Sequence, residues 1–200
     1  SWAVAPSLSG IHCAGLQPQD FTVLASNHAS MVWSPFSNLL LYGKTADVKA
    51  AKAAGVAIGI GSDWAPSGSK NLLGELKVAK WVSDSAGGIF TDAELVAMAT
   101  TTAVKILGWD TQLGSLEPGK RSDLLVVRGA AGDPYAQLIA ATEAKVDLVV
   151  INGTPRYGDP NLVKAIGGSG EAANIAGRPR TLNLAQPEED PVMQGITYAG

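Results

Sequence analysis

Residues 56–61 have the sequence VAIGIG, a run of small and β-branched apolar residues without a polar position. Side chains of a strand alternate between the two faces of its sheet, so a strand of this sequence is apolar on both faces. Such strands occur in parallel sheets whose faces are both covered by helices. The run therefore predicts a buried strand of an α/β fold, and an acid, Asp63, follows shortly after its end.

Two short strands are expected before this one, at residues 8–13 (LSGIHC) and 29–33 (ASMVW). A helix with Pro18 in its first turn separates them, because the residues after Pro18 follow a helical period. After the second strand, Ser34-Pro35 should block the ladder, and residues 36–44 are predicted to form a loop. This alternation of strand and helix implies parallel strands joined by crossover helices.

Further helices are expected on both sides of the VAIGIG strand in the sequence. A helix capped by Thr45 and ended by Gly55 should precede it. A second helix is expected at roughly residues 71–83, with Glu75 in its first turn, where a negative charge favours the helix dipole. The sequence TDAE at residues 91–94 is a capping box, which predicts the start of one more continuous helix.

The pattern changes after this α/β part, which covers residues 1–112. Residues 113–158 alternate in the manner of an antiparallel sheet, and Asn152-Gly153 favours the type I′ turn of a hairpin. Residues 159–200 are expected to hold a C-terminal helix and an extended tail. The expectation of an extended tail rests on residues 167–200, which are rich in Gly, Ala, Pro and acid and have little periodicity.

Candidate functional side chains lie at the ends of the three predicted parallel strands. His12 ends the first strand, Trp33 ends the second, and Asp63 follows the third. The carboxyl ends of parallel strands share one face of the sheet, where ligands bind. A carboxylate that leaves so apolar a strand needs a metal ion, a cation or N–H donors to offset its desolvation. The small polar loop after Asp63 leaves room for a ligand.

Each of these residues also has an ordinary structural interpretation. Asp63 can cap the next turn through its own side chain, and His12 can be a core histidine that donates to a backbone carbonyl. Trp33 and Trp64 can be packing residues, although their positions at strand ends also suit a flat aromatic ligand. From the residues alone, both interpretations remain open.

The composition limits the classes of partner. The formal net charge of -3 argues against a nucleic acid or an anionic membrane, which would require a basic patch. No apolar run approaches the ~18 residues of a membrane span. The single cysteine, Cys13, excludes a disulfide framework and a thiolate zinc cluster and favours a cytoplasmic setting. With 46% hydrophobic and 16% charged residues, either the protein is well packed or part of its surface is covered by something else.

Four segments, taken in order, resemble the C-terminal half of the amidohydrolase superfamily, and in particular its chlorohydrolase, cytosine deaminase and guanine deaminase branch. They are IHCAGLQPQDFTVLA, WSPFSNLLLYGK, AGVAIGIGSDWAPSGSKNLLGELKVA and LGSLEPGKRSDLLVV. The resemblance covers about residues 8–156. It implies strands six to eight of a metal-dependent (β/α)₈ TIM barrel, followed by part of a small antiparallel β-sandwich.

The resemblance also implies an activity and catalytic roles. The activity is hydrolysis of a C–N or C–Cl bond in a small, heterocyclic substrate. Asp63 matches the aspartate of barrel strand eight, which binds the metal, zinc or iron, and takes a proton from the attacking water. His12 matches the histidine of strand six, which contacts the substrate and that water. Asn38 matches a loop position near the substrate. The candidates for further substrate contacts are Trp33, Trp64 and Ser67.

The chain departs from that family in its metal ligands and its barrel. It has no His-x-His pair, and His12 and His28 are its only histidines, whereas a catalytic zinc ion needs about three protein ligands. Three strands also fall short of an eight-stranded barrel of ~250 residues. We therefore expect a C-terminal piece of a longer enzyme, inactive alone, that forms an oligomer with the missing N-terminal half or with a copy of itself. The alternative is a non-catalytic α/β module whose exposed sheet serves oligomer assembly.

Overall fold

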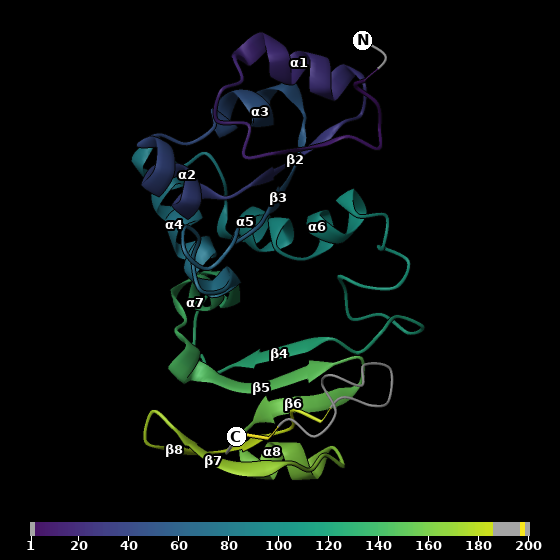
Figure 1. Cartoon of the computed structure of the whole chain (residues 1–200), viewed down its shortest axis with the longest axis vertical. Helices are drawn as coiled ribbons and strands as arrows, with labels where there is room; N and C mark the ends of the chain where they lie inside the picture. The colour runs from purple at the N-terminus through teal and green to yellow at the C-terminus, as the bar shows by residue number, and fades with distance from the viewer. Residues whose placement is uncertain (1–2, 186–196, 199–200) are drawn as a thin grey trace. The chain divides into compact units, whose positions relative to one another are not determined.

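The computed structural model describes residues 3–185 and 197–198. The chain divides into two compact units, drawn in Figure 1. The first comprises Ser1–Ser115 with Gly132–Ala140, and the second comprises Leu116–Ala131 with Ala141–Gly200. Each unit is described separately below. In the described part of the chain, no helix has the length and apolar character that crossing a bilayer requires.

The first unit is built on a parallel sheet, as the alternation of strand and helix predicts. Its strands are β1 (Ser9–Ile11), β2 (Ser30–Trp33) and β3 (Ala57–Ile60), in the order β1-β2-β3. All neighbours are parallel. Among the described residues these strands form an open sheet with β1 and β3 at its edges, so the mixed α/β fold is present and a closed eight-stranded barrel is not.

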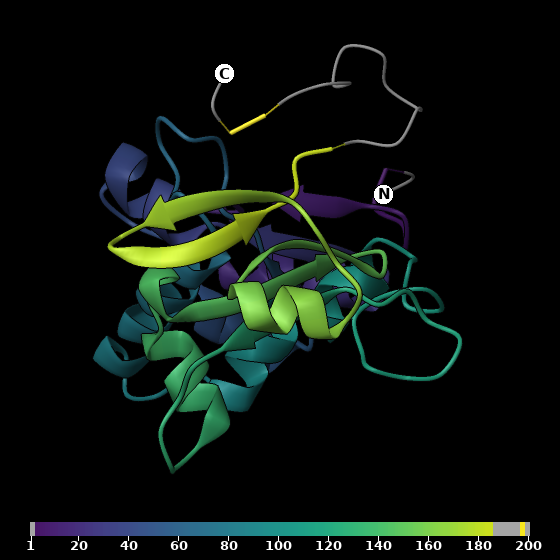
Figure 2. The same cartoon turned by 90° about the horizontal axis from the view of Figure 1, so that it is seen from below.

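Helices lie on both sides of this sheet. Figure 1 shows α1 and α3 on one side of the strands and α5 and α6 on the other. Figure 2 gives the same cartoon seen from below. Fully buried Phe21, Met31, Trp33 and Leu95 form the centre of the core. The helices of this unit are α1 (Pro18–Ser26), α2 (Pro35–Tyr42), α3 (Val48–Ala54), α4 (Leu72–Ser85), α5 (Asp92–Met98), α6 (Thr101–Ile106) and α7 (Pro134–Ala140).

The predicted loop over residues 36–44 is wrong, because most of that segment is helix α2. Pro35 occupies the first helical position, where its fixed φ favours a helix and its missing N–H costs nothing. Gly43 then ends the helix in the left-handed conformation at φ 65°. The cap predicted for Thr45 is also wrong: Asp47 caps α3 by accepting a hydrogen bond from the N–H of Ala50.

The capping box at Thr91 and Glu94 is confirmed, but the helix that it opens is interrupted. α5 ends at Met98, and Thr100 adopts φ −133° and ψ −97° before α6 begins. The Thr100 hydroxyl donates to the carbonyl of Val96, a local hydrogen bond of the kind that competes with helix continuation.

The second unit is an antiparallel sheet. Its strands are β4 (Leu124–Val127), β5 (Val146–Ile151), β6 (Thr154–Gly158), β7 (Glu171–Ile175) and β8 (Arg178–Leu182), in the order β4-β5-β6-β8-β7. A 3₁₀ turn, η1 (Glu143–Lys145), precedes β5, and α8 (Pro160–Ala165) follows β6. These described residues form a single sheet, so the β-sandwich stays a prediction.

Two hairpins shape this sheet. The predicted type I′ turn is present, with φ 50° at Asn152 and 77° at Gly153. The expectation of a loosely packed tail after residue 167 is wrong for residues 171–182, which pair as β7 and β8 around a turn at Ala176 and Gly177 with φ 52° and 75°. The rest of that predicted tail, residues 186–196 and 199–200, lies outside the described residues.

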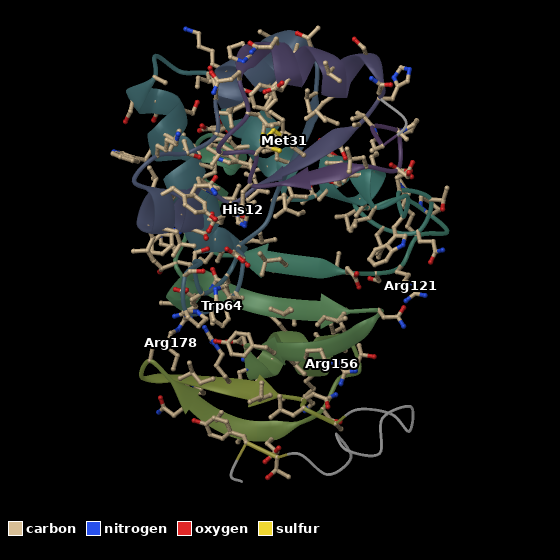
Figure 3. All side chains as sticks on the ribbon, turned by 45° about the horizontal axis from the view of Figure 1, so that its top comes forward. His12, Met31, Trp64, Arg121, Arg156 and Arg178 are labelled. Atoms are coloured by element: carbon tan, nitrogen blue, oxygen red, sulfur yellow. The ribbon has the colours of Figure 1, made fainter. Side chains whose placement is uncertain are left out.

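A carboxylate surrounded by arginines links three strands of the second unit. Asp147 on β5 forms ion pairs with Arg128, Arg178 and Arg180. Arg178 is labelled in Figure 3. The hydrogen bonds from Arg128 are the main reason that the pKa of Asp147 is lower than usual. Arg180 is almost fully buried and also donates to the Tyr157 hydroxyl and to the carbonyl of Val146, so its charge is satisfied within the sheet.

Candidate functional site

The carboxyl ends of the parallel strands bring His12 and Asp63 together. His12 directly follows β1 and Asp63 follows β3, and the two side chains come from opposite edges of the sheet. Nε2 of His12 lies 3.7 Å from Oδ2 of Asp63, and 24% of each side chain is exposed. Both residues adopt left-handed backbone conformations, with φ 65° and 61°, a strain that tends to accumulate at functional sites.

Asp63 is held as a carboxylate by hydrogen bonds from its surroundings. Its Oδ2 accepts a hydrogen bond of 2.5 Å from the Ser37 hydroxyl, and its Oδ1 accepts one of 2.9 Å from the backbone N–H of Trp64. The pKa of Asp63 is lower than usual, chiefly because of Ser37, then Trp64, with a smaller contribution from His12. The carboxylate is therefore ionised at neutral pH and can act as a proton acceptor or a metal ligand.

A chain of hydrogen bonds fixes the orientation and tautomer of His12. The indole N–H of Trp33 donates to the Thr45 hydroxyl at 2.6 Å, so the hydroxyl proton of Thr45 is free to donate to Oδ1 of Asn38 at 3.2 Å. The amide nitrogen of Asn38 then faces Nδ1 of His12 at 3.0 Å and donates to it. With the Asn38 amide in this orientation Nδ1 accepts, and the imidazole proton then lies on Nε2, on the side of Asp63.

Helix α2 supplies both of the side chains that hold this pair. Ser37 and Asn38 are adjacent and fully buried in its first turn. At its last residue, the Tyr42 ring contacts the His12 ring edge-on, with centroids 6.3 Å apart. Sequence reasoning named Asn38 of this segment as a site residue but not Ser37. The position of Ser37 next to Asn38, two residues after Pro35, is the signal that could have revealed it.

The other predicted site residues, Trp64, Ser67 and Trp33, differ in how far they are exposed. Trp64 follows Asp63 directly and is 66% exposed, and Figure 3 labels it together with His12. Ser67 is 4% exposed, and its hydroxyl makes no hydrogen bond of regular geometry among the described residues, but it lies close enough to Asp63 to make the smallest of the contributions that lower the pKa of that carboxyl group. Trp33 is fully buried, packs beside Phe90 at a centroid distance of 6.2 Å, and does not reach the surface.

The side chains present fit one part of a metal centre. Asp63 offers a carboxylate, which is an ordinary zinc ligand, whereas His12 is engaged through Nδ1 by Asn38 and carries its proton on Nε2, so it faces the site as a donor. The described residues contain no group of three or more His, Cys, Asp or Glu side chains arranged to hold a metal ion. A catalytic zinc site uses about three protein ligands, so this pair alone does not complete one.

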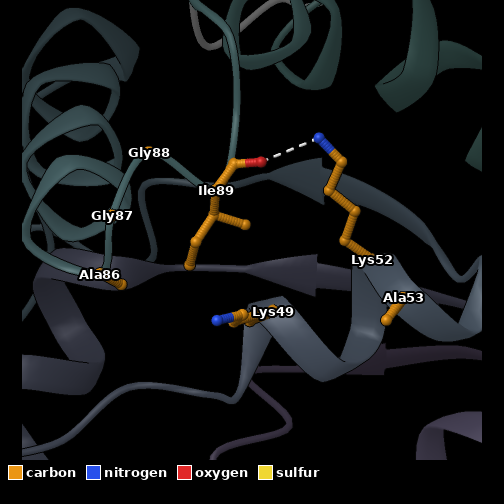
Figure 4. A pocket seen from close by; sticks show the side chains of 7 residues that line it. All are labelled: Lys49, Lys52, Ala53, Ala86, Gly87, Gly88 and Ile89. Carbon is orange, nitrogen blue, oxygen red and sulfur yellow. Dashed lines mark hydrogen bonds between the residues drawn. The ribbon is translucent and has the colours of Figure 1, made fainter.

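A pocket of different character lies near the amino ends of the strands. α3 carries Lys49 and Lys52 on one side, and the turn after α4, residues 86–89, forms the other (Figure 4). Lys52 donates to the carbonyl of Ile89 at 2.8 Å and pairs with Glu94 at 2.7 Å. Because α3 leads into the start of β3, this pocket lies at the opposite end of the strand from Asp63.

Comparison with known proteins identifies the family. A model of the amidohydrolase family matches residues 7–156, most of the chain. The chain belongs to this family. The resemblance predicted from the four sequence segments is thereby confirmed.

Individual members of the family are similar over part of their length. The 5-methylthioadenosine/S-adenosylhomocysteine deaminase of Symbiobacterium thermophilum is 34% identical over 123 residues, which are 58% of this chain and 28% of the relative. The S-triazine hydrolase of Gordonia rubripertincta is 31% identical over 158 residues, 74% of this chain and 33% of the relative. This chain thus spans about a third of the length of these curated relatives.

Solved structures show the same relationship. An adenosine deaminase from Xanthomonas campestris with bound zinc superposes with a TM-score of 0.70 at 27% identity, over 76% of this chain and 37% of that one. An atrazine chlorohydrolase from Arthrobacter aurescens TC1 complexed with zinc superposes with a TM-score of 0.67 at 25% identity, over 76% and 36% of the two chains. The names of these relatives, deaminases and hydrolases, support the resemblance of this chain to hydrolases.

Proposed function

We propose that this chain forms one side of the active site of a metal-dependent amidohydrolase. The enzyme hydrolyses a C–N bond, by deamination or cyclic amide opening, or a C–Cl bond of a small, heterocyclic substrate. The observation that carries this proposal is the meeting of His12 and Asp63 at the carboxyl ends of the strands, 3.7 Å apart. The deaminases and triazine hydrolases among the relatives support the reaction class.

The proposed roles follow from the hydrogen bonds of the two side chains. Asp63 serves as a metal ligand and as the acceptor of a proton during hydrolysis, since its carboxylate is ionised and partly exposed. His12 presents its Nε2–H toward Asp63 and the mouth of the site, where it can donate to a water molecule or to the group under attack. A divalent ion, when bound, lowers the pKa of water and polarises the substrate. Zinc in the neighbouring structures favours zinc over iron.

Substrate contacts are proposed for residues around this pair. Trp64 offers an exposed aromatic face beside Asp63, and Ser67 offers a buried hydroxyl near the same carboxyl group. Asn38 is already engaged by Thr45 and His12, so we assign it to holding His12 as well as to lining the site. Trp33 does not contact the substrate in this proposal, and its indole N–H orients the Thr45 hydroxyl that donates to Asn38.

The remaining metal ligands are proposed to come from outside these 200 residues. Asp63 is the one metal ligand proposed among the described residues of this site, and β1 and β3 each leave one edge of the parallel sheet without a strand. The missing N-terminal half of the barrel, or a second copy of this chain, would supply ligands and pair with these edges. A cytoplasmic location, with Cys13 reduced, belongs to the same proposal.

Metal content and molecular mass test this function. Four purified proteins are loaded with zinc and dialysed: the unchanged chain, Asp63→Ala, His12→Ala and the exposed control Asp110→Ala. Their metal content is measured by mass spectrometry and their molecular mass by analytical ultracentrifugation. We expect stoichiometric zinc in an oligomer of the unchanged chain, of Asp110→Ala and of His12→Ala, which removes no metal ligand, and loss of zinc in Asp63→Ala. Absence of zinc at every protein ratio would refute a site completed by a second copy of this chain and favour the non-catalytic module.

A further inference from the structure

Glu75 is a fully buried carboxyl group that the proposed chemistry does not use. It lies in the first turn of α4, where the sequence suggests only a favourable dipole partner. Its Oε1 accepts a hydrogen bond of 2.9 Å from the backbone N–H of Phe36, and its Oε2 contacts the Ser69 hydroxyl at a short distance. The two oxygens thus reach two segments that are far apart in the sequence.

The first contact fixes the start of α2. Ser34 precedes this helix but makes no capping hydrogen bond with its side chain, and Pro35 has no N–H. Glu75 therefore takes the place of a cap by accepting from Phe36, the second helical residue. The next two residues are Ser37, which donates to Asp63, and Asn38, which faces His12.

The second contact fixes the loop that follows β3. This loop, residues 61–71, carries Asp63 near its start and Ser69 near its end. Glu75 holds Ser69 with one oxygen while its other oxygen holds α2. The hydrogen bond between Ser37 and Asp63 joins the same two segments. One carboxyl group thus restrains both partners of that bond.

We propose that Glu75 is a positioning residue of the site. It ties the start of α2 to the loop after β3, and so holds Ser37 against Asp63 and Asn38 against His12. The importance of Glu75 for catalysis rests on the proposed function. Its effect on the position of His12 does not, because it can be measured on the chain alone.

The hydrogen bonds of Ser69 indicate which substitution preserves this arrangement. Its hydroxyl lies 3.0 Å from the carbonyl of Asn71 as well as against Glu75. A hydroxyl has one proton, so if it donates to Asn71 it must accept from a protonated Glu75. Burial raises the pKa of Glu75, which also favours its protonated form. Glutamine can make both contacts, by donating to Ser69 and accepting from Phe36.

The ¹⁵N spectrum of the two imidazole rings tests the proposal on the metal-free chain. The only histidines are His12 and the exposed His28, so His28 serves as an internal reference. Glu75→Leu is compared with Glu75→Gln and with Ser83→Ala. Ser83 is a matched control because it is also fully buried on α4 and accepts a backbone N–H, that of Phe90 at 2.8 Å.

We expect His12 to hold its proton on Nε2 in the unchanged chain, in Glu75→Gln and in Ser83→Ala. In Glu75→Leu, its tautomer ratio should shift toward the ratio of His28. An unchanged His12 signal in folded Glu75→Leu, or an equal shift in Ser83→Ala, would overturn the proposal. If Glu75→Leu does not fold, Ser69→Ala must shift the His12 signal, and no shift there overturns it. Failure of the chain to bind zinc bears on the proposed function alone and leaves this test of Glu75 intact.

Discussion

Replacing Thr45 by valine should destabilise the chain far more than its position between two helices suggests. The substitution keeps the shape of the side chain but removes a hydroxyl that accepts from the indole of Trp33 and donates to Asn38. Both partners are fully buried, so water cannot replace the lost hydrogen bonds. Each buried group left unpaired costs about 1–3 kcal/mol, which gives about 2–6 kcal/mol in total. That is a large part of the ~5–15 kcal/mol by which a domain is stable.

Urea unfolding of three variants measures this loss. Thr45→Val should lower the free energy of unfolding by the stated amount, while Thr45→Ser keeps the hydroxyl and should stay much closer to the unchanged chain. Thr22→Val makes the same chemical change at an exposed position of α1 and should shift stability by no more than ~0.5 kcal/mol. The same spectra of His12 should show mixed tautomers in Thr45→Val. A loss equal to that of Thr22→Val, with His12 unchanged, would refute the hydrogen-bond chain from Trp33 to His12.

Two further predictions concern the second unit. The pKa of Asp147 is lower than usual mainly because of Arg128, so its contribution to stability is complete above the unfolded value of about 3.9 and is lost as the pH falls through the folded pKa. Below about pH 4 the unchanged chain should therefore lose stability more steeply than Asp147→Asn in acid titrations of unfolding, and parallel curves would contradict this. Gly153 has φ 77° with open space around it, so Gly153→Ala should cost about 1–2 kcal/mol through backbone strain alone. Gly15 also has open space but no positive φ, so Gly15→Ala should be neutral or stabilising in the same thermal melts, and equal effects of the two would argue against strain.

Much of the fold could be predicted because local signals and periodicity determine it. The apolar run before Asp63 predicts a buried parallel strand, and the pair Asn152-Gly153 predicts its turn from the φ angles that those residues tolerate. The loop predicted after Ser34-Pro35 failed because the same proline that ends a strand also begins a helix well. Which of these two roles Pro35 takes depends on what packs against the following residues.

The sequence by itself determined that His12 and Asp63 lie at strand ends of a parallel sheet, because the order of strands and helices dictates which ends share a face. Only the tertiary structure decided which groups complete their hydrogen bonds. Thr45 and Glu75 carry no sequence pattern that marks these contacts, since each acts on a partner at least seven residues away through space. The periodicity of hydrophobic residues in the sequence indicates which side of a helix or strand is buried. The direction of a buried hydroxyl or carboxyl group is set by the donors and acceptors that the folded chain brings to it.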